Sequence, residues 1–169
     1  SGLYKEVGPE KYLEYMHDYF YNATAPYMQG YWDKPFKERA LIAINAPRMF
    51  HDCNMKILGE DDEKLWFVMD PCGAGQKLWD MGLCKEGLGL CDKPSKITAS
   101  GENFPVYCTH APIAEIICDE LGVPYMYQQQ YPEQVGPCSC VFCVYKDPKD
   151  IPDSYFELVG VPRPEICKK

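Results

Sequence analysis

The sequence predicts a mixed α+β domain in which an N-terminal helical layer packs on a small antiparallel sheet with a C-terminal β-hairpin. Two observations support this class. Apolar residues recur at helical spacing in the first third of the chain, and short aromatic runs bounded by turn residues follow. The resulting order of helices, strand, helix, hairpin and helix is typical of α+β proteins. No repeat, low-complexity tract or Gly/Ser linker divides the chain, so we expect a single domain over residues 1–169.

Two helices are expected in the N-terminal layer. The first begins at Pro9, a residue suited to a first helical turn, and ends before Pro26. The second covers residues 35–45, and its apolar rhythm predicts a continuation over 48–58 despite Pro47. Both helices present one apolar stripe toward a core.

Short strands and helices are expected in the rest of the chain. The aromatic run at 65–69 lies between turn residues and predicts a strand. Gly122 and Pro124 end the helical pattern that precedes them. The remaining expected elements are helices over 76–81, 112–121 and 153–158 and the hairpin strands 123–130 and 138–145.

Net charge excludes several kinds of partner. The chain carries a formal net charge of -8 at pH 7 and shows no basic stripe, which argues against nucleic acid and against an anionic membrane surface. No apolar run is long enough for a transmembrane helix. We therefore expect a small-molecule ligand or substrate, and the composition is also compatible with a homo-oligomer.

Cysteine usage bears on the compartment. A chain of 169 residues buries enough surface to fold without cross-links, so its ten cysteines are not needed to form stabilising disulfide bonds. We expect a reduced, cytoplasmic protein. The alternative is an extracellular disulfide protein, which the glycosylation triplet Asn22-Ala23-Thr24 would fit.

Cys72 is the first candidate for chemistry. Gly73 and Gly75 let the backbone turn tightly and approach a ligand, and unpaired N–H groups of the following helix would lower the pKa of this thiol. These features predict a thiolate nucleophile or a metal ligand at Cys72, with the two glycines contacting substrate. The alternative is a small buried residue beside two turn glycines.

Cys108 and His110 form the second candidate. They flank one residue at the start of the helix expected over 112–121, where both side chains could reach a cleft. A cysteine and a histidine at this spacing either ligate one metal or act as a nucleophile and its base, with His110 moving the proton. A helix-capping or core histidine is the alternative.

Three further cysteines follow in the last hairpin strand. Alternation of side chains puts Cys138 and Cys140 on one face with Phe142, and Cys143 on the other. We therefore pair Cys140 with Cys108 and interpret Cys143 as a packed core thiol. Together the sequence predicts a zinc or iron site, with the ligands Cys72, Cys108, His110 and Cys140. An iron–sulfur cluster is a further hypothesis, although the spacings match no cluster motif.

Two other groups of residues are weighed for function. Tyr127 and Gln129 alternate along the first hairpin strand and are expected to line a pocket, unless the tyrosine row only covers a helix. His51, Asp52 and Cys53 are adjacent in the expected second helix. Adjacent helical residues diverge by about 100°, so one site cannot use all three if the helix continues.

A stretch near the C-terminus resembles two known families. Cys108 precedes a helix, Glu120-Leu121-Gly122-Val123-Pro124 ends it, and a strand rich in aromatic residues and glutamine leads to Gly136 and Cys140-Val141-Phe142. This order resembles the L-2-amino-thiazoline-4-carboxylic acid hydrolase-like family and the 4-vinyl reductase-like ligand-binding domains.

The two resemblances imply different functions. The first implies an enzyme that hydrolyses a C–N bond in a small cyclic or amidine-like substrate, with a thiolate nucleophile at Cys72 or Cys108 or a metal-activated water. The second implies a sensor domain that binds a small molecule or metal without turnover. The residues alone permit both functions.

Overall fold

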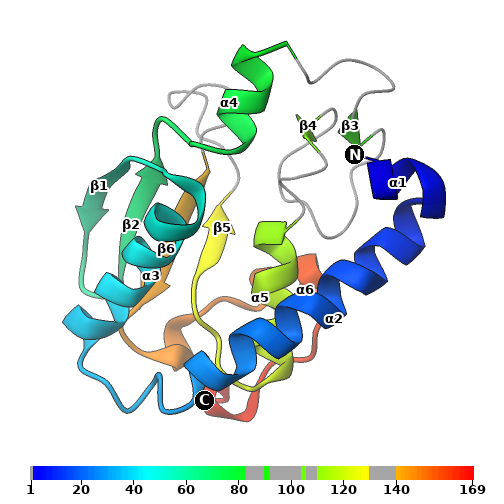
Figure 1. Cartoon of the computed structure of the whole chain (residues 1–169). Helices are drawn as coiled ribbons and strands as arrows, with labels where there is room; N and C mark the ends of the chain where they lie inside the picture. Colours follow the sequence, from blue (N-terminus) through cyan, green and yellow to red (C-terminus); the bar gives the residue numbers. More distant parts are fainter. Residues whose placement is uncertain (1, 83–89, 92–103, 106–109, 130–139) are drawn as a thin grey trace.

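The computed structural model of the chain describes residues 2–82, 90–91, 104–105, 110–129 and 140–169. In chain order, the elements are α1 (Gly2–Val7), α2 (Pro9–Met28), α3 (Phe36–His51), β1 (Met55–Glu60), β2 (Lys64–Met69), α4 (Gly75–Asp80), β3 (Leu90–Cys91), β4 (Phe104–Pro105), α5 (His110–Glu120), β5 (Tyr127–Gln129), β6 (Val141–Tyr145), η2 (Pro148–Asp150), α6 (Asp153–Val159) and η3 (Glu165–Cys167). The N-terminal helices and the antiparallel sheet confirm the α+β class (Figure 1).

The main sheet has four strands in the order β1-β2-β6-β5, and every neighbouring pair is antiparallel. At its centre Phe67 of β2 lies opposite Phe142 of β6, and their rings stack with centroids 5.9 Å apart. β5 pairs with β6 through Tyr127 and Cys143, which agrees with the pairing expected of the C-terminal hairpin. The chain between these two strands lies outside the described residues.

Helices cover both faces of the central strands, and all five residues of β6 are buried. On one face Phe67 and Phe142 pack with Ala43 of α3. On the other face Cys143 packs with Phe156 of α6 and with side chains near the C-terminus. Side-chain alternation in β6 therefore separates two distinct cores, and it confirms that Cys140 and Phe142 share a face that Cys143 does not.

Arg39 anchors α3 to the end of β6. Its buried guanidinium donates to the backbone carbonyl oxygens of Tyr145 at 2.9 Å and Lys146 at 2.7 Å. The same group stacks on the ring of Trp32, with 4.0 Å between the guanidinium carbon and the ring centroid. These contacts replace the water that a buried cation loses, so they hold the helix in one position over the sheet.

The long helix α2 packs against α5 on the side away from β1 (Figure 1). His17 of α2 lies 2.8 Å from the carboxylate of Glu120 at the end of α5. Where α2 ends, Met28 and Tyr31 form a buried cluster with Cys118 of α5. No helix within the described ranges is both long enough and apolar enough to cross a membrane.

The largest error of the sequence-based prediction concerns residues 48–58. The expected continuous helix is wrong, because α3 ends at His51 and β1 begins at Met55. Asp52 between them adopts a left-handed conformation with φ 50°, which ends the helix. Residues 55–60 instead pair with β2, where backbone hydrogen bonds to a neighbouring strand outweigh the local helical pattern.

The helix end predicted before Pro26 is also wrong. Helix α2 includes Pro26 and ends at Met28, beyond the expected end. Pro26 removes one backbone hydrogen bond to the preceding turn, and the helix continues for only two residues beyond it. The strand expected over 65–69 and the helices expected over 76–81, 112–121 and 153–158 are all present, with ends shifted by one or two residues.

Candidate functional site

The end of α3 and the loop before α4 lie against each other and bring two cysteines together. A Cβ atom on Gly73 would lie 2.0 Å from the backbone oxygen of His51, so only glycine permits this close approach. Backbone hydrogen bonds join the same segments, from Asn54 N–H to the Pro71 oxygen at 3.0 Å and from Asp70 N–H to the Asn54 oxygen at 2.9 Å.

The two sulfur atoms of this contact are those of Cys53 and Cys72, 3.8 Å apart. The Cys53 thiol faces the Cys72 sulfur and also lies 3.6 Å from the backbone oxygen of His51. Cys53 is 4% exposed and Cys72 is 8% exposed. Both belong to the core that contains Phe67 and Phe142, which limits the freedom of their side chains.

The two thiols of this pair have opposite pKa shifts. The pKa of Cys72 lies well below its usual value because the Cys53 thiol donates to its sulfur and because the N–H groups of Ala74, Gln76 and Gly75 point at it, which outweighs burial. The pKa of Cys53 lies above its usual value because its proton is shared with Cys72 and because it is buried. Both shifts favour the negative charge on Cys72 and the proton on Cys53 when the pair loses one proton.

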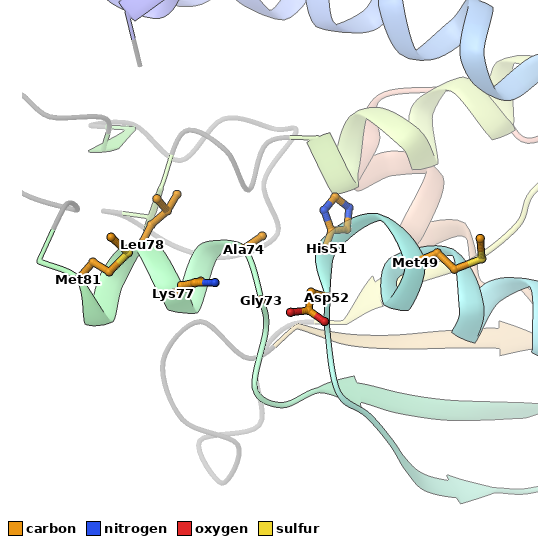
Figure 2. A pocket seen from close by; sticks show the side chains of 8 residues that line it. All are labelled: Met49, His51, Asp52, Gly73, Ala74, Lys77, Leu78 and Met81. Atoms are coloured by element: carbon orange, nitrogen blue, oxygen red, sulfur yellow. The ribbon is translucent and has the colours of Figure 1, made fainter.

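A pocket of about 410 Å³ lies between the end of α3 and α4, and its lining includes the residue before Cys53 and the residue after Cys72 (Figure 2). Its volume is within the range of small-molecule sites. The side chains of Lys77 and Asp52 bring charges of both signs to a lining that is otherwise mostly apolar. The lining residues are Met49, His51, Asp52, Gly73, Ala74, Lys77, Leu78 and Met81. Neither sulfur lines the pocket, but the residues next to both cysteines in the chain do.

Cys140 belongs to the same region. It is half-buried and packs against the core cluster that contains Cys53 and Cys72, and its charge contributes to the raised pKa of Cys53. Two of the four predicted metal ligands, Cys72 and Cys140, are therefore in one cluster. Cys108 and Cys138 lie outside the described residues, and His110 is the first residue of α5, with a side chain that is not described.

The described part of the chain does not by itself form the predicted zinc or iron site. Within it, no three side chains of the His, Cys, Asp or Glu type are grouped so that they could hold a metal ion. Such a site would need Cys108 or His110, and it therefore stays a prediction. We derive no chemical step through a metal.

The residues predicted to bind substrate divide into two groups. Gly73 lines the pocket, and the buried Gly75 directs its N–H at Cys72. Tyr127 instead lies in the second core, only 2% exposed, and its hydroxyl donates to the carboxylate of Asp119 at 2.9 Å. Gln129 lies in β5, and its side chain is not described.

The sequence interpretation weighs Cys53 only together with His51 and Asp52, and it misses the contact of Cys53 with Cys72. A continuous helix over residues 48–58 would point these three adjacent side chains in different directions. Asp52 is one of the residue types that adopt the left-handed conformation, and two residues later Asn54 is a weak helix former. These two residues indicate that the helix ends near Asp52. A helix end at this point leaves Cys53 outside the helix, where it can contact Cys72.

Comparison of the chain with family models, with curated proteins and with solved structures gave no match. The resemblance of residues 108–144 to two families therefore stays a prediction. We derive function from the Cys53–Cys72 pair and from the pocket beside it.

Proposed function

We propose that the chain is a small-molecule enzyme in which the Cys72 thiolate attacks an electrophilic carbon and hydrolyses a C–N bond of a cyclic or amidine-like substrate. The observation that carries this proposal is the lowered pKa of Cys72 next to a pocket of small-molecule size. The resemblance of residues 108–144 to the L-2-amino-thiazoline-4-carboxylic acid hydrolase-like family supports the same reaction class.

The reaction consists of two displacements. The Cys72 sulfur bonds to the substrate carbon, and the C–N bond breaks as the nitrogen takes up a proton and leaves. Water then attacks the same carbon, the carbon–sulfur bond breaks, and the thiolate is restored. The proton that the water loses replaces the proton given to the leaving nitrogen. In the resting protein the N–H groups of Ala74, Gly75 and Gln76 point at the Cys72 sulfur, so they stabilise the nucleophile before attack and the leaving thiolate afterwards.

The pocket suits a substrate with charges of both signs. Lys77 offers a partner for a carboxylate, and Asp52 offers one for an amidinium group. Met49, Leu78 and Met81 provide apolar walls for a small ring. His51 lines the same pocket, so it is a candidate for delivering the proton to the leaving nitrogen, the role that the sequence assigned to His110.

The test combines alkylation with turnover. Iodoacetamide should label Cys72 first, and at pH values below the ordinary thiol pKa of about 8.5, because its pKa is lowered. With 2-amino-thiazoline-4-carboxylic acid as the probe, turnover should be detected by mass spectrometry as the gain of one water. Cys72→Ser should abolish both labelling and turnover, whereas Cys143→Ser, on the other face of the sheet, should leave both unchanged.

Three results would contradict the proposal. Turnover that survives in a folded Cys72→Ser protein would place the chemistry on another residue. Binding of the probe by the wild type without any turnover would favour the sensor function that the second resemblance implies. Loss of turnover on chelation, with Cys72 labelling unchanged, would replace the thiolate mechanism by a metal-activated water.

A further inference from the structure

We propose that Cys72 and Cys53 also act as a dithiol that reduces small organic disulfides by thiol–disulfide exchange, Cys72 as the attacking thiol and Cys53 as the resolving thiol. This activity shares the nucleophile of the proposed hydrolysis and gives Cys53 a second role. In hydrolysis its thiol only donates to the Cys72 sulfur, whereas in the exchange it forms a bond to that sulfur.

The geometry of the pair supports disulfide formation. The two sulfur atoms are 3.8 Å apart, whereas a disulfide bond is about 2 Å long, so the sulfurs must approach by a little less than 2 Å. A rotation of one cysteine side chain provides a movement of this size. The backbone contact at Gly73 and the hydrogen bonds of Asn54 hold the two segments together while the sulfurs move.

The exchange balances in two steps. The Cys72 thiolate attacks one sulfur of the disulfide R–S–S–R, a Cys72–S–S–R mixed disulfide forms, and one thiolate R–S⁻ leaves with the electron pair of the broken bond. Cys53 then loses its proton and attacks the Cys72 sulfur, the Cys53–Cys72 disulfide forms, and the second R–S⁻ leaves. The two cysteines are oxidised by two electrons, and the small disulfide is reduced to two thiols.

Hydrogen bonding fixes the order of the two cysteines. The Cys53 thiol donates toward the Cys72 sulfur, and Cys72 is the more exposed of the two, so Cys72 attacks first. The pKa of Cys53 is raised chiefly by the hydrogen bond to Cys72, and that cause disappears once the Cys72 sulfur is bonded to R. Burial still raises the pKa of Cys53 at that stage, and the N–H of Gly73 lowers it. Formation of the mixed disulfide thus removes the largest obstacle to ionisation of the resolving thiol.

Burial limits the substrate to small disulfides. Cys72 retains 8% exposure, which is too little for the disulfide of a folded protein to reach its sulfur. The pocket of about 410 Å³ lies next to both cysteines through its lining residues Asp52 and Gly73. A compact organic disulfide fits in such a space.

The other buried thiols lack this arrangement. Cys118 lies in α5 among apolar side chains, and its pKa is raised by burial. Cys143 and Cys167 lie in the core on the opposite face of the sheet. Among the described residues, Cys140 is the closest competitor, because it packs on the same cluster as the pair.

The test uses the full chain, reduced and then freed of reductant, with hydroxyethyl disulfide as the probe. In the wild type we expect a loss of two hydrogen atoms by mass, a Cys53–Cys72 disulfide in the peptide map, and two thiols released per chain. Cys53→Ser keeps a hydroxyl donor for Cys72 and should stop at a stable mixed disulfide on that residue. Cys72→Ser should react at neither position, and the control Cys118→Ala should behave as the wild type.

Each other outcome has a definite meaning. A wild-type protein that stops at the mixed disulfide overturns the dithiol and leaves the nucleophile of the proposed hydrolase intact. A disulfide between Cys72 and Cys140 overturns the assignment of Cys53. A folded wild type in which Cys72 does not react overturns both proposals. A Cys53–Cys72 disulfide in a protein without hydrolytic turnover overturns the hydrolase alone. If Cys53→Ser does not fold, the wild-type peptide map decides.

Discussion

The two faces of the β2–β6 pair both bury ionisable groups, but they favour opposite charge states. On the face covered by α3, the buried Cys72 has a lowered pKa, which favours its thiolate form. On the face covered by α6, Tyr127 packs and donates to Asp119, whose pKa is raised to about 7 by burial. Burial is common to both sites, so it does not decide which form is stable.

The difference lies in the number of hydrogen-bond donors. The Cys72 sulfur accepts hydrogen bonds from the Cys53 thiol and from several backbone N–H groups. One carboxyl oxygen of Asp119 accepts a hydrogen bond from the Tyr127 hydroxyl. The other oxygen is buried without a hydrogen-bond partner among the described residues. A buried anion is stable where donors replace water, and a buried acid stays protonated where they do not. The donors around Cys72 therefore indicate a site built for a thiolate.

The largest expected effect comes from Gly73→Ala. The new methyl group would lie 2.0 Å from the His51 oxygen and 2.5 Å from the Asp52 oxygen, and both are backbone atoms that cannot move alone. We expect the free energy of unfolding to fall by about 4 kcal/mol and the fast reaction of Cys72 with iodoacetamide to disappear.

The matched control is Gly160→Ala, which strains a residue of positive φ but meets open space. We expect a loss of about 1 kcal/mol by urea unfolding, with Cys72 labelling unchanged. Equal losses in the two variants would contradict the close approach of the α3 end to the loop before α4.

Asp119 should make stability depend on pH. Its pKa is about 7 in the folded protein and 3.8 for the ordinary carboxyl group, so the folded state binds a proton that the unfolded state releases between these values. The stabilising contribution is complete below the ordinary pKa and is lost as the pH rises through about 7. It amounts to about 4 kcal/mol, at about 1.4 kcal/mol for each unit of pKa difference.

The measurement compares unfolding of the wild type and Asp119→Asn from about pH 4 to pH 8. The difference in unfolding free energy between them should change over this range, because asparagine does not titrate. A difference that is constant with pH would show that Asp119 is ionised in the folded protein throughout, which would remove the contrast with Cys72.

Tyr127→Phe should have a smaller effect of the same kind. It removes the hydroxyl that donates to Asp119 at 2.9 Å while keeping the packing of the ring against Tyr155. We expect a loss of about 1 kcal/mol near neutral pH. Because this hydrogen bond lowers the pKa of Asp119, its removal should also move the pH transition of stability upward. A downward movement would mean that the hydroxyl favours the protonated carboxyl group.

The sequence predicted some parts of the molecule because their signals are local. The aromatic run of β2 and the helical spacing of α5 require no knowledge of distant residues, and the alternation in β6 correctly separated Cys140 from Cys143. Cys72 was also selected as a candidate from a local signal, its two neighbouring glycines. Its partner Cys53 was not, because their contact depends on where α3 ends and on the pairing of β1 with β2.

The smallest expected effect concerns Lys77, which lines the pocket but is exposed. Its positive charge should attract an anionic reagent toward Cys72, so Lys77→Gln should slow labelling by iodoacetate about two- to threefold relative to labelling by the neutral iodoacetamide. High salt should remove the difference, because it screens exposed charges. The control Lys37→Gln alters an exposed lysine about 20 Å away, at the other end of α3, and should leave the ratio unchanged. Equal changes in both variants would attribute the effect to net charge, and only a change confined to Lys77→Gln supports the pocket as the route by which reagents reach the thiolate.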